Sequence, residues 1–267
     1  MPTVPSSVVA VPEAGQICLW TLGADNFAMP GAASSLEAVL SPEETKEALR
    51  IPLVASRRQF IVGRAMLRRV LSSHFPVPVA AWRFARDHNR KPFVCAPRMP
   101  LPIQFSISHT EGLIACLVTL SSSAAVDVEK VEHSPDLPAV AAEFLSLGER
   151  KTLEALPGPE WTARFFDYWT LKEAYAKARG LGLQLKLSEF EFHFGRDDTI
   201  RMACPSRMDD NWREWRFWCR RQSSSHVISV AVRKDFEGPL EVVSRTVEID
   251  ASGFLAAAGS SPFSSGA

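Results

Sequence analysis

Asp127 and Glu129 are two carboxylic acids separated by one residue in the run Ala125–Glu129. Alternate side chains of a strand share a face, so the pattern predicts that both carboxylates point the same way while Val126 and Val128 face a core. Two adjacent carboxylates repel each other, and a divalent cation relieves that repulsion. Oxygen ligands that leave room for water and phosphate suit Mg²⁺. Taken alone, the pattern is more typical of a solvated strand face or turn with two surface acids.

A third acid and a base follow on a strongly helical segment, roughly residues 160–179. Trp169, Glu173 and Lys177 stand at positions i, i+4 and i+8 and therefore lie on one stripe of the helix. In that arrangement Glu173 is a candidate third metal ligand, and Lys177 is placed to meet a phosphate. An ordinary Glu–Lys surface pair, worth about 0.2–0.5 kcal/mol, gives the same spacing. Lys172 lies about 100° off this stripe, so its role must differ from that of Lys177.

Basic and polar residues gather before these acids. A turn between two predicted strands carries Arg86, Asn89, Arg90, Lys91 and Pro92, and a strand ends on Ser108 and His109. Arginine and lysine beside a Ser-His pair suit an anionic ligand that bears a ring. Arg57 and Arg64 add positive charge to an earlier helix. The same pattern is also produced by a solvated loop, by a histidine that is hydrogen-bonded to the backbone, and by solvated helix arginines.

The two halves of the chain repeat one order of elements, a long helix followed by antiparallel strands. The first helix is predicted at roughly residues 55–74 and the second at roughly 160–179. A shift of about a hundred residues aligns Ser41 with Ser146 and Phe60 with Phe165. We therefore expect an α/β (α+β) fold of two similar halves, with a site at the seam between them, where pockets often form.

The expected division of the chain has four parts. Residues 16–135 form the N-terminal half and residues 136–250 the C-terminal half. Residues 1–15 are rich in Pro, Ser and Val, and residues 251–267 in Gly, Ala and Ser. Both ends are predicted to be flexible tails. Within the second half, the apolar and basic stretch Trp212–Arg221 fits either a partner-docking patch or an amphipathic strand.

Composition limits the class of protein. The 267 residues are 46% hydrophobic, which is enough for one large core or two smaller ones. Lys plus Arg equals Asp plus Glu at 30 each, so the overall charge gives no electrostatic footprint for nucleic acid. Five cysteines without a CxxC pair favour a reduced, cytoplasmic chain with no zinc site. The beginning of the chain does not read as a signal peptide, and no apolar run is long enough to cross a membrane.

Taken in order, the motifs resemble those of the surfactin-type 4'-phosphopantetheinyl transferases. The resemblance covers roughly residues 41–232 and rests on Lys91-Pro92, Phe105–Thr110, Val126–Glu129 and Trp169–Gly180. It implies two α/β halves related by a pseudo-twofold axis, each with a long helix on a small antiparallel sheet. It also implies transfer of the phosphopantetheine arm of coenzyme A to a serine of an apo acyl or peptidyl carrier protein, with release of 3',5'-ADP.

The resemblance also assigns roles to residues. Asp127, Glu129 and Glu173 would hold Mg²⁺, and the catalytic residues would be Glu173, Lys177 and Asp127, with Glu173 as general base. The residues implied for coenzyme A are Arg57, Arg64, Arg86, Asn89, Arg90, Lys91, Pro92, Ser108, His109, Lys172 and Lys177. The chain would act as a monomer, without nucleic acid or membrane.

The chain departs from the family pattern at a few positions. Ala125 and Arg90 stand where glycines are usual. Glu44 and Glu47 stand where some members carry phosphate-binding lysines, so Arg57 and Arg64 become the candidates for that role. Two other classes remain open on the residues alone: a magnesium-dependent nuclease that uses the three carboxylates, and a non-catalytic module that binds coenzyme A or the carrier.

Overall fold

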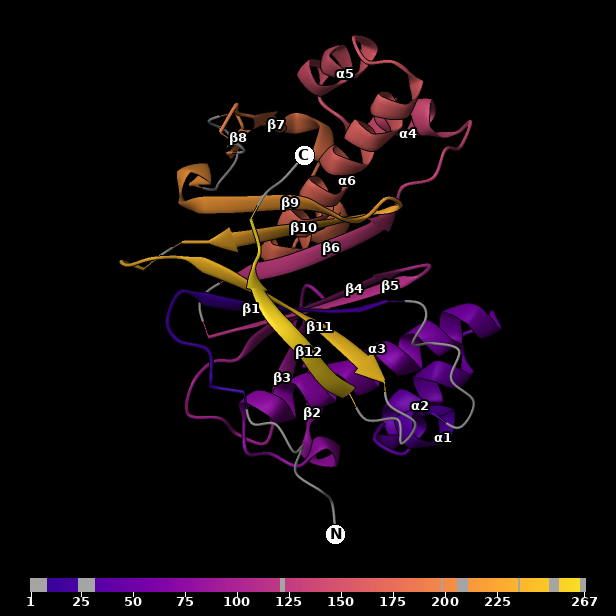
Figure 1. Cartoon of the computed structure of the whole chain (residues 1–267), viewed down its shortest axis with the longest axis vertical. Coiled ribbons are helices and arrows are strands. Elements are labelled where there is room, and N and C mark those ends of the chain that lie inside the picture. Colours follow the sequence, from indigo (N-terminus) through magenta and orange to yellow (C-terminus); the bar gives the residue numbers. More distant parts are fainter. Residues whose placement is uncertain are drawn as a thin grey trace. The chain divides into compact units, whose positions relative to one another are not determined.

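The computed structural model describes residues 9–23, 32–120, 123–197, 199–205, 211–234, 236–249 and 255–264. The chain forms two compact units (Figure 1). Unit 1 comprises residues 1–121 and 239–262, and unit 2 comprises residues 122–238 and 263–267.

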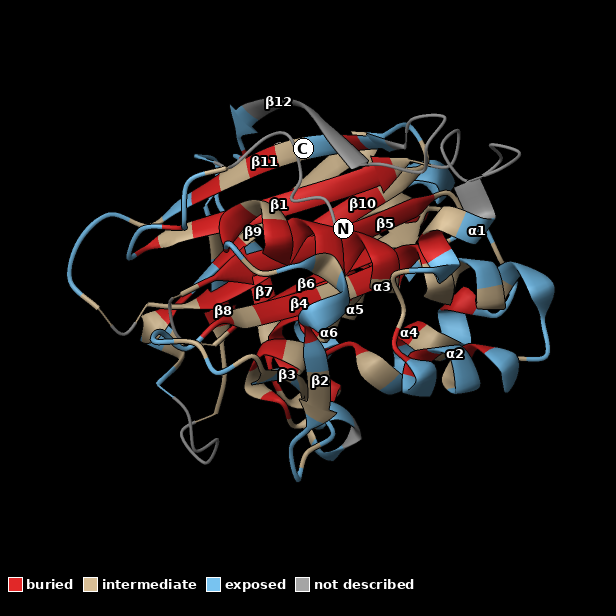
Figure 2. Ribbon diagram, turned by 90° about the horizontal axis from the view of Figure 1, so that it is seen from below, coloured by how far each residue is buried: buried red, intermediate tan, exposed pale blue. Residues whose placement is uncertain are grey.

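Unit 1 is built on a five-stranded sheet in the order β12-β11-β1-β5-β4. Its strands are β1 (Gln16–Gly23), β4 (Gln104–Thr110), β5 (Leu113–Thr119), β11 (Glu241–Ile249) and β12 (Leu255–Pro262). The β1–β11 pair is parallel, and the other pairs are antiparallel. All seven residues of β5 are buried (Figure 2), so both faces of this strand are covered.

Three helices belong to unit 1: α1 (Ala32–Glu37), α2 (Pro42–Leu49) and α3 (Val54–His74). The long helix α3 contributes Met66, Leu67 and Leu71, each fully buried, to the same core as β5. A short helix, η2 (Val79–Ala81), leads into a hairpin of β2 (Arg83–Arg86) and β3 (Pro92–Ala96).

Unit 2 is built on a three-stranded antiparallel sheet in the order β6-β10-β9. Its strands are β6 (Ala124–Lys130), β9 (Trp215–Ser223) and β10 (His226–Arg233). The helix α6 (Gly158–Arg179) packs on this sheet. The remaining elements are α4 (Leu137–Phe144), α5 (Leu147–Glu154), η3 (Gly182–Gln184), η4 (Leu187–Glu189), η5 (Trp212–Glu214) and the hairpin of β7 (Glu191–Phe194) and β8 (Ile200–Ala203).

One short helix in each unit begins in the same way, α2 in unit 1 and α5 in unit 2. Ser41 and Ser146 each accept a hydrogen bond from the backbone of a glutamate three residues on, which in turn accepts one from the serine backbone. These capping boxes satisfy backbone donors at the start of α2 and α5. Each glutamate also forms an ion pair with a buried cation on the long helix of its own unit. Glu44 pairs with Arg68 of α3, and Glu149 pairs with Lys172 of α6. The internal repeat inferred from the sequence therefore has a matching local structure.

The predicted α+β fold and both long helices are confirmed, because each unit places a long helix on a sheet with antiparallel strands. The pseudo-twofold arrangement stays a prediction. None of the described helices combines the length and the apolar character needed to cross a membrane.

The units divide at other points than the predicted halves. Strand β6 hydrogen-bonds to β10, so the boundary falls before residue 122 instead of after residue 135. The segment 239–262 returns to unit 1, where β11 pairs with β1. Long-range strand pairing of this kind leaves no local signal in the sequence.

Some residues of both predicted tails form hydrogen bonds with unit 1, and the flexibility of the tails stays a prediction. In the C-terminal one, β12 pairs with β11, while residues 251–254 and 265–267 lie outside the described residues. Near the N-terminus, the Val9 N–H donates to the Ser73 carbonyl at 2.9 Å, and the His74 ring bonds the Ala10 carbonyl at 2.8 Å. Residues 1–8 lie outside the described part.

Candidate active site

Strand β6 places the two acids of the Asp-x-Glu run against helix α6. Asp127 is 3% exposed, and Glu129 is half-buried. The ammonium of Lys177 forms an ion pair with Asp127 Oδ1. The Trp169 indole Nε1 donates to Glu129 Oε1 at 3.4 Å. Because both partners belong to α6, the two carboxylates face the same way, as the alternation of a strand predicts.

Helix α6 supplies the other half of the site along one stripe. Its residues Trp169, Glu173 and Lys177 follow each other at one-turn intervals, and each is half-buried. The helix ends at Gly180, whose φ of 69° lies in the left-handed region that favours glycine. We call Asp127, Glu129, Glu173 and Lys177 the carboxylate–lysine cluster.

The electrostatics of the cluster show that its four groups act on one another. Burial raises the pKa of Glu173, the negative charge of Asp127 raises it further, and Lys177 opposes both effects. Burial lowers the pKa of Lys177, but Asp127, Glu173 and Glu129 together outweigh burial and raise it. Lys177 therefore stays protonated, and three carboxylates facing one ammonium leave an excess of negative charge.

The cluster fits a magnesium ion in its chemistry but does not form a complete ligand set. Carboxylate oxygens and excess negative charge are what Mg²⁺ prefers. Among the residues that the structure describes, no group of three His, Cys, Asp or Glu side chains lies close enough together to hold a metal ion. The Lys177 ammonium instead contacts Asp127 Oδ1. Ligation by Asp127, Glu129 and Glu173 therefore stays a proposal.

A row of buried polar side chains supports the cluster. This row was not predicted from the sequence. Ser229 on β10 stands opposite Asp127 on β6 and opposite Cys219 on β9. The Ser229 hydroxyl lies 2.7 Å from the Thr170 hydroxyl of α6. Cys219 donates to Asp167, which also accepts from Arg221 at 2.6 Å. These bonds fix α6 against the sheet next to Asp127, one turn before Glu173.

Lys172 requires a correction, because its predicted contact with coenzyme A does not fit its position. Its side chain is fully buried. The ammonium pairs with Glu149 Oε2 at 2.8 Å and donates to the carbonyls of Leu187 at 2.7 Å and Phe190 at 2.6 Å. An ammonium has three donors, and all three are used inside unit 2. The helical spacing places Lys172 off the stripe of Lys177, but it does not reveal that Glu149 is the partner of Lys172.

The basic turn of unit 1 is held by hydrogen bonds from its own backbone N–H groups to the side chain of one acid. Asp87 Oδ1 accepts from the backbone N–H groups of Asn89 at 2.9 Å and Lys91 at 2.8 Å. Arg90 adopts a φ of 66°, the conformation for which glycine is usual. Arg86 is exposed and pairs with Glu47 at 3.4 Å.

Lys91 and Pro92 are half-buried at the end of this turn. Burial lowers the pKa of Lys91, and Asp87 acts against that shift. Further along, Ser108 is buried and His109 is exposed near the end of β4.

The two helix arginines have partners within unit 1. Arg57 donates through Nε and Nη2 to the Ile51 carbonyl, at 3.0 and 2.8 Å. The guanidinium of Arg64 lies 5.3 Å from the centre of the Phe60 ring, and its Nε is 3.9 Å from Glu44. Burial lowers the pKa of Arg64. The predicted contacts of both arginines with coenzyme A stay predictions, as does a site shared by the two units.

Comparison with known proteins identifies the class of protein. Residues 123–231 match the family model of the 4'-phosphopantetheinyl transferase superfamily, and residues 30–122 match the model of a 4'-phosphopantetheinyl transferase N-terminal domain. The chain is 31% identical to the 4'-phosphopantetheinyl transferase HetI of a Nostoc species, over 66% of this chain and 73% of that protein. This chain belongs to the 4'-phosphopantetheinyl transferase superfamily, and it is a transferase.

Two further known proteins are similar to the chain. The identity is 28% with the 4'-phosphopantetheinyl transferase Sfp of Bacillus subtilis, over 62% of this chain and 71% of that protein. Among solved structures, a holo-(acyl-carrier-protein) synthase from Bacillus anthracis, in complex with CoA (3',5'-ADP), matches 42% of this chain and 94% of its own. Its identity is 17% and its TM-score 0.36.

Proposed function

We propose that this protein transfers the 4'-phosphopantetheine group of coenzyme A to a serine of an apo acyl or peptidyl carrier protein, releases 3',5'-ADP and depends on Mg²⁺. The carboxylate–lysine cluster carries this proposal, since it brings together on β6 and α6 the four residues to which the resemblance gives roles. Membership of the superfamily supports the reaction type.

The serine hydroxyl of the carrier attacks the β-phosphorus of coenzyme A, so the enzyme itself needs no nucleophile. Its contribution is positioning and charge stabilisation. A magnesium ion held by Asp127, Glu129 and Glu173 would supply positive charge beside the diphosphate. Lys177 offsets charge on the leaving phosphate. A unit-charge contact at about 4 Å is worth about 4 kcal/mol at an effective dielectric constant of 20, before desolvation is subtracted.

Glu173 acts as the general base. Burial and Asp127 raise the pKa of the Glu173 carboxylate, whereas a magnesium ion bound to it would lower that pKa and weaken the carboxylate as a base. It takes the proton of the serine hydroxyl directly or through a water molecule. Asp127, another carboxylate of the cluster, already pairs with Lys177.

Coenzyme A is held by residues of unit 1 in this proposal. The candidates are Arg57, Arg64, Arg86, Asn89, Arg90, Lys91, Pro92, Ser108 and His109, joined by Lys177 of unit 2. Lys91 is half-buried and Arg86 is exposed. In this proposal, these two cations bind the anionic groups of coenzyme A. We also propose a cytoplasmic location, because all five cysteines are free, and a monomer, because an internally repeated chain can act alone.

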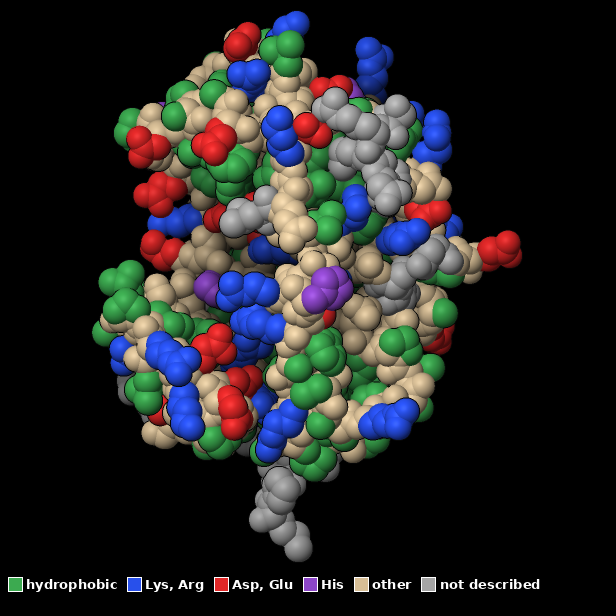
Figure 3. Space-filling model, turned by 180° about the vertical axis from the view of Figure 1, so that it is seen from behind, with side chains coloured by type: hydrophobic (Ala, Val, Ile, Leu, Met, Phe, Trp, Pro, Cys, Tyr) green, Lys and Arg blue, Asp and Glu red, His purple; other side chains and the backbone are tan. Residues whose placement is uncertain are grey.

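A nuclease with the same carboxylates is the rival that this proposal must exclude. Basic and acidic side chains occur together over the face shown in Figure 3, and the formal net charge is zero. Incubation with plasmid DNA and Mg²⁺ is expected to leave the plasmid intact.

Replacing Asp127 tests the proposed metal site. Asp127→Asn is expected to shift the Mg²⁺ titration of the transfer reaction to higher concentrations by at least roughly ten-fold, because the most buried carboxylate of the set loses its charge. The matched control is Asp136→Asn, an exposed position before α4. A titration that is the same for Asp127→Asn and the wild type would show that this carboxylate does not bind the metal.

A further inference from the structure

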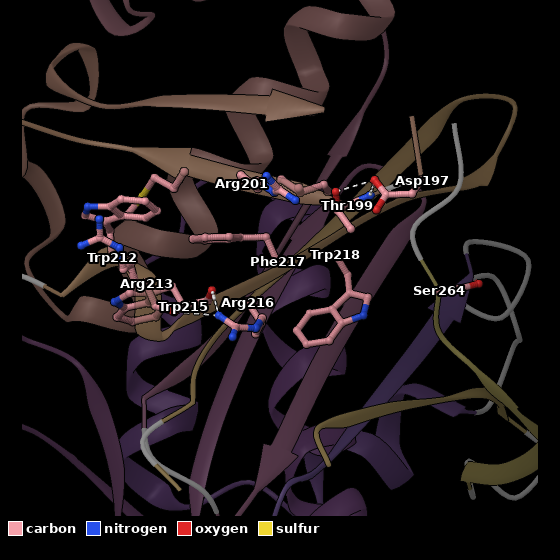
Figure 4. Close-up of a pocket in the computed structure, with 12 residues that line it drawn as sticks. Asp197, Thr199, Arg201, Trp212, Arg213, Trp215, Arg216, Phe217, Trp218 and Ser264 are labelled. Atoms are coloured by element: carbon pink, nitrogen blue, oxygen red, sulfur yellow. Dashed lines mark hydrogen bonds between the residues drawn. The ribbon is translucent and has the colours of Figure 1, made fainter. Parts of the chain in front are cut away.

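A groove on unit 2 has no residue of the carboxylate–lysine cluster in its lining and has no role in the proposed chemistry (Figure 4). Its volume is about 800 Å³, and it is lined by residues of β8, η5 and β9 together with Asp197, Thr199 and Ser264. Three tryptophans and three arginines dominate the lining: Trp212, Trp215, Trp218, Arg201, Arg213 and Arg216. Most of them come from the apolar and basic stretch that the sequence singled out.

Two of the three guanidinium groups of the groove, those of Arg213 and Arg216, have contacts within unit 2 before any partner binds. The Arg213 guanidinium lies 4.6 Å from the centre of the Trp212 ring, a cation–π distance. Arg216 Nη1 donates to the carbonyls of Arg213 at 2.8 Å and Trp215 at 2.9 Å. Side chains that are already ordered lose less entropy when they bind a partner.

Within the described part of the groove, arginines outnumber acids. Glu214 is the one acid within the run Trp212–Trp218. It accepts from Arg233 at 2.9 Å and from Asn211 at 2.8 Å, and it does not line the groove. Asp197 is the carboxylate in the lining, and it accepts from the Thr199 hydroxyl at 2.6 Å. Among the described lining residues, three arginines stand against one aspartate, so this part of the groove is basic.

Composition and exposure identify the kind of ligand. Tryptophan and arginine are the residues most enriched among those that dominate the energy of protein–protein interfaces. Arg201, Arg213 and Arg216 are exposed, and Trp212 and Trp218 are half-buried. An apolar side chain of a partner fits among the indoles while its carboxylates meet the guanidiniums.

We propose that this groove docks the carrier protein, through an acidic face of the carrier that also presents an apolar side chain. The inference rests on the proposed function, which makes a folded protein the second substrate. Binding energy gained away from the reacting atoms acts on the ground state and the transition state alike. It therefore lowers the KM for the carrier and leaves kcat unchanged.

Charge reversal in the groove tests this proposal. In the double variant Arg213→Glu/Arg216→Glu, the KM for the apo carrier protein is expected to rise at least roughly ten-fold. The kcat at saturating carrier and the KM for coenzyme A are expected to stay the same. In the wild type, the KM for the carrier is expected to rise with salt concentration, and this dependence is expected to weaken in the variant. The matched control is Lys151→Glu, an exposed charge on α5 outside the groove.

Direct binding separates a failure of docking from a failure of the proposed reaction. The probe is an apo carrier protein whose acceptor serine is replaced by alanine, titrated against the enzyme without coenzyme A. Weaker binding by the double variant than by the wild type and the Lys151→Glu control supports the groove whether or not transfer occurs. Equal Kd values for all three proteins would overturn the proposal, and so would a change confined to kcat or to the KM for coenzyme A. Trp212→Ala, which removes an indole without reversing a charge, is expected to weaken binding in the same direction.

Discussion

Glu173→Gln is expected to reduce phosphopantetheine transfer by roughly 10³-fold or more while the fold stays intact. Glutamine keeps the shape of the side chain but accepts no proton at neutral pH and binds Mg²⁺ weakly. The carboxylate is half-buried on the same stripe as Lys177, whose own pKa is raised by Asp127 and by Glu173. The loss should therefore appear in kcat, with little change in the KM for either substrate.

The control for this variant is Glu160→Gln, an exposed glutamate in the first turn of the same helix. It is expected to keep wild-type turnover. Circular dichroism and the thermal midpoint should be unchanged in both variants. Turnover of Glu173→Gln close to the wild-type value would exclude Glu173 as the general base.

Lys172→Met is expected to lower the free energy of unfolding by about 3–5 kcal/mol. The substitution leaves the buried carboxylate of Glu149 without its cation and removes the donor for the carbonyls of Leu187 and Phe190. Breaking a buried pair from one side costs far more than removing a surface charge, because the remaining charge stays away from water. Urea unfolding measures the change.

Two comparisons sharpen this result. Lys151→Met, on the exposed side of α5, is expected to change stability by less than about 0.5 kcal/mol. The double variant Glu149→Gln/Lys172→Met is expected to lose less than the sum of its single changes, since no unpaired charge remains buried. A contact between Lys172 and coenzyme A predicts the opposite: near wild-type stability of Lys172→Met with a raised KM for coenzyme A.

Local patterns in the sequence predicted the elements that carry the chemistry. Helical spacing placed Trp169, Glu173 and Lys177 on one stripe, and strand alternation placed Asp127 and Glu129 on one face. The structure joins the two sets through the Lys177–Asp127 and Trp169–Glu129 contacts. Such spacing depends on backbone geometry alone, which is why it can be read without knowledge of the fold.

Features that depend on distant pairing were not predictable in the same way. The pairing of β11 with β1 brings residues near the two ends of the chain together, and no local periodicity encodes it. Lys172 shows the same limit for a side chain. Its neighbours on the helix do not reveal that Glu149, Leu187 and Phe190 converge on its ammonium. The capping box at Ser146 explains why Glu149 is held there.

The central claim is that the chain moves a phosphopantetheine group onto a carrier serine, and mass spectrometry of the carrier tests it most directly. Purified protein, coenzyme A, Mg²⁺ and an apo carrier protein are incubated together. The carrier is expected to gain the mass of one phosphopantetheine group, and one equivalent of 3',5'-ADP should appear. A carrier with alanine in place of the acceptor serine should gain nothing. An apo carrier of unchanged mass, in a reaction where a known transferase modifies the same carrier fully, would contradict the claim.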